Sequence, residues 1–161
     1  MASHFQLRLA TPDDAALISK LLYDAFVEFK PFYTPGGFAA TTPSAEQVLT
    51  RMSEGPVWLV VRETEPLGTV AAVLKGESVY MRGMAVLPTA RGLGVGAQLL
   101  ETVEHWASKH GSARVFLTTT PFLHAAIGMY EKHGFRRVER APQDLFGTPL
   151  FTMDKRISAA E

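Results

Sequence analysis

Apolar and polar side chains alternate in residues 5–9, which is the period-two pattern of a strand with one buried face. A helix is expected next, because residues 11–14 read Thr-Pro-Asp-Asp, a typical helix start. Pro31 should end this helix. Its apolar stripe at helical spacing consists of Leu17, Leu21, Leu22, Ala25, Phe26 and Phe29.

The segment Pro31–Thr42 is rich in proline, glycine and threonine, and we expect a loop there. Its aromatic residues Phe32, Tyr33 and Phe38 need covering, so the loop either lies over the core or forms a wall facing a substrate. Both interpretations remain open. Thr42 and Pro43 should open another short helix that Gly55-Pro56 closes.

Three β-forming segments follow and predict an antiparallel meander, with a turn at Glu65–Gly68 between the first two. A striped helix ending at Gly111 comes after a glycine-rich turn. The order of elements predicts an α/β (mixed α+β) fold in a single domain, residues 1–161, with about six to seven strands flanked by about four helices. The remaining expected elements are the strands Val57–Thr64, Thr69–Leu74, Val79–Leu87 and Ala113–Thr120, the helix Phe122–His133, and the strands Phe135–Glu139 and Leu150–Lys155.

The amino-acid composition mainly excludes several classes of function. Sixteen basic and sixteen acidic side chains give no net charge, so the broad positive field of a nucleic-acid or membrane-surface binder is not expected. No segment approaches the ~20 apolar residues of a membrane span, which favours a cytoplasmic protein. The chain has no cysteine, which excludes disulfides, thiolate metal ligands and a cysteine nucleophile. The histidines lack metal-ligand spacing such as HExxH, so we expect no metal site.

The most specific motif is the turn Arg91-Gly-Leu-Gly-Val-Gly96 between a predicted strand and a predicted helix. Glycines in such a turn let successive N–H groups point at a phosphate, and Arg91 adds a charged donor. A merely flexible turn is the alternative. A dinucleotide site is disfavoured because the following strand has no carboxylate, and a Walker loop is excluded because no Gly-Lys-Ser/Thr follows.

This turn resembles the acyl-CoA pyrophosphate signature of the GNAT-type N-acetyltransferase superfamily. Residues 81–88, Met-Arg-Gly-Met-Ala-Val-Leu-Pro, resemble the strand ahead of that loop, and residues 126–135, Ala-Ile-Gly-Met-Tyr-Glu-Lys-His-Gly-Phe, resemble a second block of the family. The resemblance covers nearly the whole chain. It implies a V-shaped splay between the strands Val79–Leu87 and Ala113–Thr120, with acetyl-CoA bound as a substrate in the cleft.

The resemblance also implies roles for individual residues. Main-chain groups around Met84, Ala85 and Val86 would bind the pantetheine arm, and Tyr130 would contact the cofactor and donate to the departing CoA thiolate. Core packing is the alternative role of Tyr130. The family's asparagine seven residues earlier is replaced by Leu123. The residues expected to hold the pyrophosphate are Arg91, Gly92, Leu93, Gly94, Val95 and Gly96.

The expected function is direct transfer of an acetyl group to a primary amine of a small metabolite, peptide or protein. The alternative is a CoA-binding sensor or partner module without catalysis. Candidate bases are His124, Glu28 and Glu77, and Arg82 or Lys30 could meet an acidic acceptor, although all five also fit ordinary surface positions. Homodimers are common among similar proteins.

Overall fold

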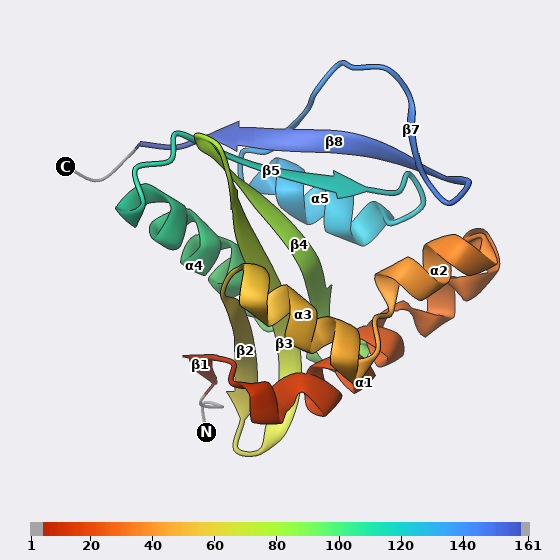
Figure 1. The fold of residues 1–161 in the computed structure, drawn as a ribbon, viewed down its shortest axis with the longest axis vertical. Helices are drawn as coiled ribbons and strands as arrows, with labels where there is room; N and C mark the ends of the chain where they lie inside the picture. Colours follow the sequence, from red (N-terminus) through yellow and green to blue (C-terminus); the bar gives the residue numbers. More distant parts are fainter. Residues whose placement is uncertain (1–4, 159–161) are drawn as a thin grey trace.

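The computed structural model describes residues 5–158; the ends of the predicted domain, residues 1–4 and 159–161, lie outside the described residues. Its centre is an eight-stranded mixed sheet with the order β1-β2-β3-β4-β5-β8-β6, and β7 pairs with β8 (Figure 1). The predicted mixed α/β fold is confirmed. The strands are β1 Gln6–Leu9, β2 Val57–Arg62, β3 Glu65–Lys75, β4 Ser78–Val86, β5 Arg114–Thr119, β6 Arg136–Arg137, β7 Gln143–Leu145 and β8 Thr148–Arg156.

Five α-helices accompany the sheet, and among the helices of residues 5–158 none is long and apolar enough to cross a bilayer. Two of them, α1 and α3, cover one face of the β2–β4 meander, and α4 covers the other. The helices are α1 Ala15–Phe26, α2 Pro35–Thr41, α3 Ala45–Glu54, α4 Val95–Lys109 and α5 His124–Lys132, with 3-10 segments η1 Pro12–Asp14, η2 Val27–Phe32 and η3 Pro88–Ala90.

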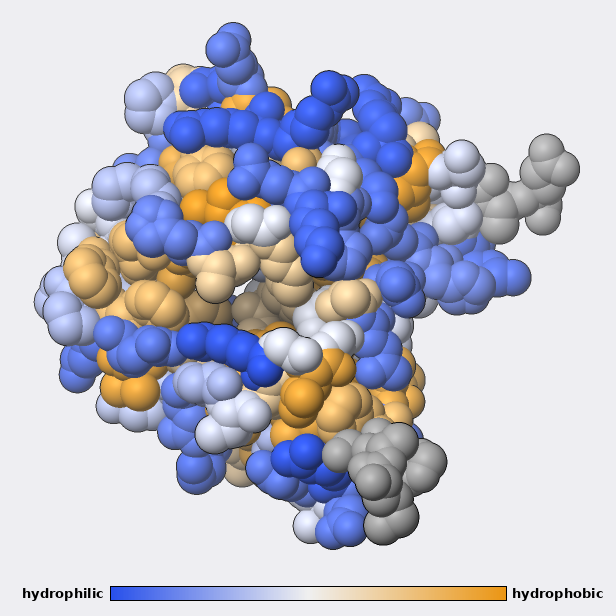
Figure 2. All heavy atoms as spheres, turned by 180° about the vertical axis from the view of Figure 1, so that it is seen from behind, coloured by the Kyte–Doolittle hydropathy of each residue, from blue (hydrophilic) through white to orange (hydrophobic). Residues whose placement is uncertain are grey.

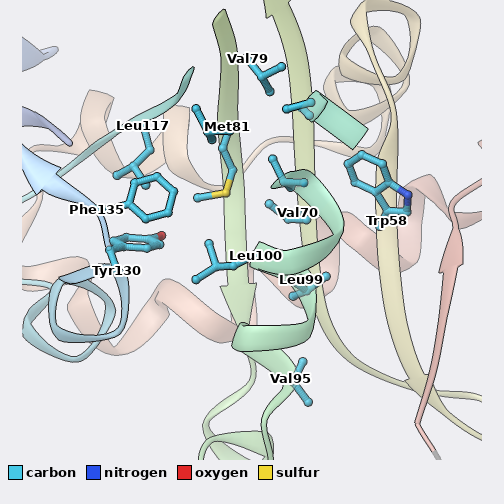
Figure 3. Close-up of a cluster of buried hydrophobic side chains, with 14 of the residues drawn as sticks. Trp58, Val70, Val79, Met81, Val95, Leu99, Leu100, Leu117, Tyr130 and Phe135 are labelled. Carbon is cyan, nitrogen blue, oxygen red and sulfur yellow. The ribbon is translucent and has the colours of Figure 1, made fainter. Parts of the chain in front are cut away.

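The core divides between the two faces of the sheet. Along β2, Trp58 and Val60 contribute to the cluster under α4, whereas Leu59 and Val61 belong to the cluster under α1 and α3. Successive strand residues point to opposite faces, so a strand covered on both sides is apolar at nearly every position. This is why β2 reads as a continuous hydrophobic run. Figure 3 shows part of the first cluster, with Leu99 and Leu100 of α4 packed over the face of the sheet.

The prediction of a loop at Pro31–Thr42 is wrong, because this segment contains the whole of α2 and the end of η2. Thr34 begins the helix by accepting a hydrogen bond from Gly37 N–H at 3.0 Å, and Pro35 occupies the first helical position. A Cβ at Gly37 would lie 2.2 Å from Thr148 Oγ1. The glycine that suggested flexibility therefore permits close packing of α2 on β8.

The predicted turn at Glu65–Gly68 is also wrong. The chain turns before Glu65, where β3 begins. Glu63 lies in this turn and has a left-handed φ of 58°. A Cβ at Gly68 would lie 2.8 Å from Val95 Cγ1 and 3.0 Å from the Ala85 carbonyl oxygen. Gly68 is thus a strand residue that lets the start of α4 approach the sheet closely.

At the C-terminal end, the predicted strand Phe135–Glu139 is shortened to β6, in which Arg136 and Arg137 pair with β8; Val138 N–H adds one hydrogen bond to the Thr152 carbonyl at 2.9 Å. The short strand β7 was not predicted; it forms a hairpin with β8 that ends in Phe146-Gly147. Gly134, at φ 92°, follows the end of α5 as expected for a helix stop.

An acid-sensitive contact holds the start of α1. Arg8 donates to both carboxylate oxygens of Asp14, at 2.7 and 2.9 Å, and thereby lowers the pKa of that carboxyl from 3.8 to about 2. Asp14 also accepts the Thr11 N–H at 2.8 Å. Because the folded pKa lies below the unfolded one, this stabilisation is present above about pH 4 and is lost as the pH falls towards 2.

Asp14→Asn should therefore lower the free energy of unfolding at pH 7 by about 1–2 kcal/mol, since the pair is partly exposed. The deficit should shrink between about pH 4 and pH 2. Urea unfolding of wild type and variant across this range measures it, with exposed Asp13→Asn as control. An equal deficit at every pH would contradict this assignment.

Candidate active site

A cleft opens where β4 and β5 stop pairing. The parallel ladder joins only Ser78–Tyr80 to Arg114–Phe116, and beyond these residues the two strands separate. This confirms the predicted V-shaped splay. The cleft holds a cavity of about 460 Å³ between β4, β5, α5 and the α1–α3 region. Seen from behind, the molecule is hollowed near its centre, where the two parts of the sheet diverge (Figure 2).

One edge of β4 faces this cleft with its main chain. Leu87 N–H donates to the Leu67 carbonyl of β3 at 2.9 Å. Because the N–H and C=O of successive strand residues point to alternate edges, those of Val86 and Met84 point away from β3 and towards the cleft. Met84, Ala85 and Val86, the residues of β4 predicted to contact the cofactor, all line the cavity. The side chain of Ala85 is buried in the core cluster that includes α1, so this residue only helps to form the wall of the cavity.

A bulge shapes this part of β4. Thr69 pairs with Ala85 and Ala71 pairs with Arg82, so two residues of β4, Gly83 and Met84, stand opposite one residue of β3. Gly83 has φ 61°, a left-handed conformation that favours glycine. The bulge bends β4 at the level of the cavity.

The glycine turn leads directly into α4. Gly92 and Gly94 both have left-handed φ angles, 83° and 82°, and a Cβ at either would face open space. Gln98 N–H makes the first bond of the helix, to the Gly94 carbonyl. The N–H groups of the preceding residues, including Ala97, have no acceptor within the helix and mark its positive end. An anion can approach them without steric obstruction.

The other predicted residues of the turn differ in exposure. Leu93 is 45% exposed, whereas the side chain of Val95 is buried in the core. Gly96 lies in the first turn of α4, and a Cβ there would come within 2.4 Å of Met129 Sδ. Gly96 therefore lets α4 and α5 approach each other beside the cleft, so its own contribution towards an anion is its N–H.

Arg91 lines the cavity and donates to Glu28 of η2 at 2.7 Å. Both side chains are about 40% exposed, so the pair is solvent-screened and can rearrange at small cost. Glu28, one candidate base, is held by this ion pair and does not line the cavity.

Tyr130 combines burial with access to the cavity. It is 5% exposed, its ring lies 5.9 Å from that of Phe135, and it lines the cavity from α5. Its hydroxyl points towards the side chains of Met81 and Leu100 (Figure 3). Burial raises the pKa of Tyr130 above its usual range, and the nearby Tyr33 phenol adds to this rise. The Tyr130 phenol therefore stays protonated at all physiological pH values.

The remaining candidate groups are spread around the molecule. His124 is the exposed first residue of α5, and Glu77 is exposed in the β3–β4 turn, at the paired end of β4; neither lines the cavity. Lys30 lies over the Phe38 ring at 5.5 Å and also lies outside the lining. Of the two predicted cations, only Arg82 reaches the cavity.

The sequence assigned no individual role to several residues that line the cavity. Arg51 reaches the cavity from α3, Tyr33 and Thr41 reach it from the segment expected to be a loop, and Thr120 follows β5. Thr120 Oγ1 is buried without a hydrogen-bond partner in the described part of the chain. The segment Pro31–Thr42 thus forms a wall of the cavity, one of the two roles considered for it. Leu123, which stands where the resemblance implies an asparagine, also lines the cavity.

Comparisons with known proteins agree with this architecture. A similar curated protein is YjgM, an uncharacterized N-acetyltransferase of Escherichia coli strain K12, which is 27% identical over 141 residues, 84% of each chain. Among solved structures, PaiA N-acetyltransferase from Thermoplasma acidophilum in complex with coenzyme A superposes with a TM-score of 0.82 at 14% identity, over 96% of this chain and 99% of that one.

The ribosomal-protein-S18-alanine N-acetyltransferase of Escherichia coli has a TM-score of 0.76 at 17% identity, covering 98% of this chain and 97% of the other. At these identities the two solved structures establish the shared fold. The model of the acetyltransferase (GNAT) family matches residues 20–135, which include both β4 and the turn before α4 as well as Tyr130. The chain therefore belongs to the acetyltransferase (GNAT) family.

Proposed function

We propose that this protein transfers the acetyl group of acetyl-CoA directly to a primary amine in the cleft between β4 and β5. The observation that carries the proposal is the continuity of the cleft. It runs from Arg91, beside the N-terminus of α4, along the main-chain edge of β4 to Tyr130. Family membership and the coenzyme A complex of a structural neighbour support the same substrate.

The residues present fit acetyl-CoA at two places. The N–H groups at the start of α4, with Gly92 and Gly94 leaving the approach open, suit a pyrophosphate. The outward main-chain groups of Met84 and Val86 suit the amides of the pantetheine arm, which would extend the sheet as an additional strand does. An N–H of β4 can also donate to the thioester carbonyl as negative charge develops there.

In the proposed reaction the amine nitrogen attacks the thioester carbon, the new C–N bond replaces the C–S bond, and the products are an amide and CoA. The nitrogen loses a proton to water, and water in turn supplies the proton taken up by the sulfur. The chain has no cysteine, so no cysteinyl acyl-enzyme can form and direct transfer is favoured. Among the described residues, the lining of the cavity contains no carboxylate or histidine. Water is accordingly the proposed carrier of the amine proton.

Tyr130 is proposed to act at the sulfur. An ordinary thiol has a pKa of about 8.5, below that of a phenol. Since burial raises the pKa of Tyr130 further, its contribution is a hydrogen bond to the developing thiolate, with the proton remaining mainly on the phenol oxygen.

The direct test is release of free CoA thiol from acetyl-CoA in the presence of a panel of primary amines, with the acetylated product identified by mass spectrometry. We expect amine-dependent release with equal amounts of thiol and amide. CoA binding, measured by calorimetry, without turnover on any amine would favour a binding module instead. Thermal stabilisation by ATP or NAD but not CoA would contradict the proposal altogether.

A further inference from the structure

Two arginines form a cationic wall in the part of the cleft away from the glycine turn. Arg51 from α3 and Arg82 from β4 both line the cavity. Arg82 and Tyr80 precede the bulge of β4, whereas Met84 and Val86 follow it. The described lining of the cavity includes three arginines, with Arg91 as the third, and no acidic side chain; Glu54 and Glu28, which pair with Arg82 and Arg91, lie outside the lining. A ligand in this part of the cleft therefore meets an excess of positive charge.

Arg51 is held in place by the main chain. Its Nη2 donates to the Ala40 carbonyl, near the end of α2, at 3.2 Å. Its Nη1 lies over the bulge of β4, where a Cβ on Gly83 would come within 3.1 Å. Burial lowers the pKa of Arg51, and the charge of Arg82 lowers it further. Burial and the neighbouring Arg82 both disfavour the charged form of Arg51, so an anion that binds beside its guanidinium stabilises that charge.

The positive charge of Arg82 is only partly balanced by an acidic partner. Its Nη2 pairs with Glu54, whose side chain is 47% exposed and lies outside the cavity lining. The Nε of Arg82 is buried and has no hydrogen-bond partner within residues 5–158. Glu54 can balance one of the two arginines, so a net positive charge remains on the wall. The planar, forked guanidinium of an arginine is suited to binding a carboxylate.

The position of the wall matches a small ligand. Arg82 precedes Met84 by two residues across the bulge, so the arginine and the cleft-facing main chain of Met84 lie close together along β4. An α-amino acid holds its nitrogen and its carboxylate close together, so the carboxylate can lie at the arginines while the nitrogen lies near the thioester carbon. The surrounding wall includes Phe26, Phe29, Leu145 and Leu150, which suit an apolar side chain.

Resting on the proposed acetyl transfer, we propose that the acceptor is a small apolar amino acid, or a similar amine with a carboxylate, and that Arg51 and Arg82 bind this carboxylate. The wall repels alkylammonium ions that have no carboxylate. Its positive field also favours the neutral form of a bound amine, which is the nucleophile, in a cavity whose described lining supplies no base.

The first test compares matched amines that differ only in the carboxylate: L-phenylalanine with 2-phenylethylamine, and L-leucine with 3-methylbutylamine. We expect kcat/KM to be about 10- to 100-fold higher for the amino acid of each pair, as for loss of a hydrogen bond to a charged group. In Arg51→Gln and Arg82→Gln this ratio should fall towards one. Arg62→Gln is the control, because Arg62 also pairs with one surface glutamate but lies outside the cavity.

The second test needs no turnover. Calorimetry with CoA-saturated protein should show N-acetyl-L-phenylalanine binding about 10- to 100-fold more tightly than N-acetyl-2-phenylethylamine, with the difference lost in the arginine variants. If Arg51→Gln fails to fold, Arg51→Lys replaces it; the lysine keeps the charge without the planar fork and should lose most of the preference.

The two hypotheses fail differently. Equal kcat/KM within each pair would overturn the carboxylate site and leave acetyl transfer intact. An absence of turnover with every amine, while CoA binds, would overturn acetyl transfer. In that case the calorimetric comparison still decides on the arginine site, since equal binding of the two acetylated compounds would overturn it and a difference lost in the variants would support it.

Discussion

Tyr130→Phe is expected to lower kcat for acetyl transfer by about 10²- to 10³-fold, the usual cost of removing one donor to a developing negative charge in an enclosed site. The substitution removes only the hydroxyl group. The ring should keep its place beside Phe135, 5.9 Å away, because α5 and the core around it are unchanged. KM for acetyl-CoA should change little, since the proposed hydrogen bond forms mainly as the C–S bond breaks.

The measurement is thiol release at saturating substrates, with Tyr23→Phe as control. Tyr23 is 44% exposed, contacts Phe38 edge to face, and does not line the cavity. Because the pKa of Tyr130 is raised above about 10, wild-type kcat should show no descending limb below that pH from loss of its proton. Undiminished kcat in Tyr130→Phe would leave this tyrosine with its packing role only.

The parts of the fold that could be predicted are those whose signals are local. The turn Arg91–Gly96 contains both the glycines of the left-handed positions and the start of α4, so a short stretch of sequence specifies it. The β4–α4–β5 crossover follows from the order of elements, and the splay was implied by resemblance. The ladder of only three residue pairs between β4 and β5 then appears in the structure.

The incorrect predictions of secondary structure occur at glycines that allow close packing between segments far apart in the sequence. Gly37 lies against Thr148, and Gly68 lies against Val95. The sequence pattern predicts a loop at Gly37 and a turn at Gly68, because a sequence shows that a Cβ is missing but does not show which neighbour requires its absence. A residue pair separated by more than a hundred positions, such as Gly37 and Thr148, leaves no local pattern.

The residues on the acceptor side of the cleft could not be fully predicted from the sequence, for a related reason. Arg51 occurs in an amphipathic helix where an arginine normally indicates a solvated face, yet the bulge at Gly83 and the carbonyl of Ala40 bring its guanidinium to the cavity. Arg82 could be named as a candidate from its place in a strand. Its partnership with Arg51 depends on the docking of α3 against β4, which only the three-dimensional structure shows.

Gly94→Asp is expected to raise the Kd for CoA by at least about 100-fold, because like charges brought together in a binding site cost several kcal/mol. Gly94 caps α4 at φ 82°, and a Cβ there would face open space, so the new carboxylate would stand where the pyrophosphate is proposed to bind. The fold should survive, since aspartate tolerates the left-handed region better than most residues and the position is exposed.

Gly94→Asn separates charge from shape. Asparagine has nearly the same size as aspartate and tolerates the same φ, so both variants should lose similar, small amounts of stability in urea unfolding. The asparagine variant should raise the Kd for CoA by no more than about 10-fold, because it brings no charge to the N-terminus of α4. Calorimetric titration of CoA into the two variants measures the difference. Equal affinities for CoA in Gly94→Asp and wild type would place the pyrophosphate elsewhere. An equal loss of CoA affinity in both variants would show that the size of the side chain, rather than its charge, limits binding at this turn.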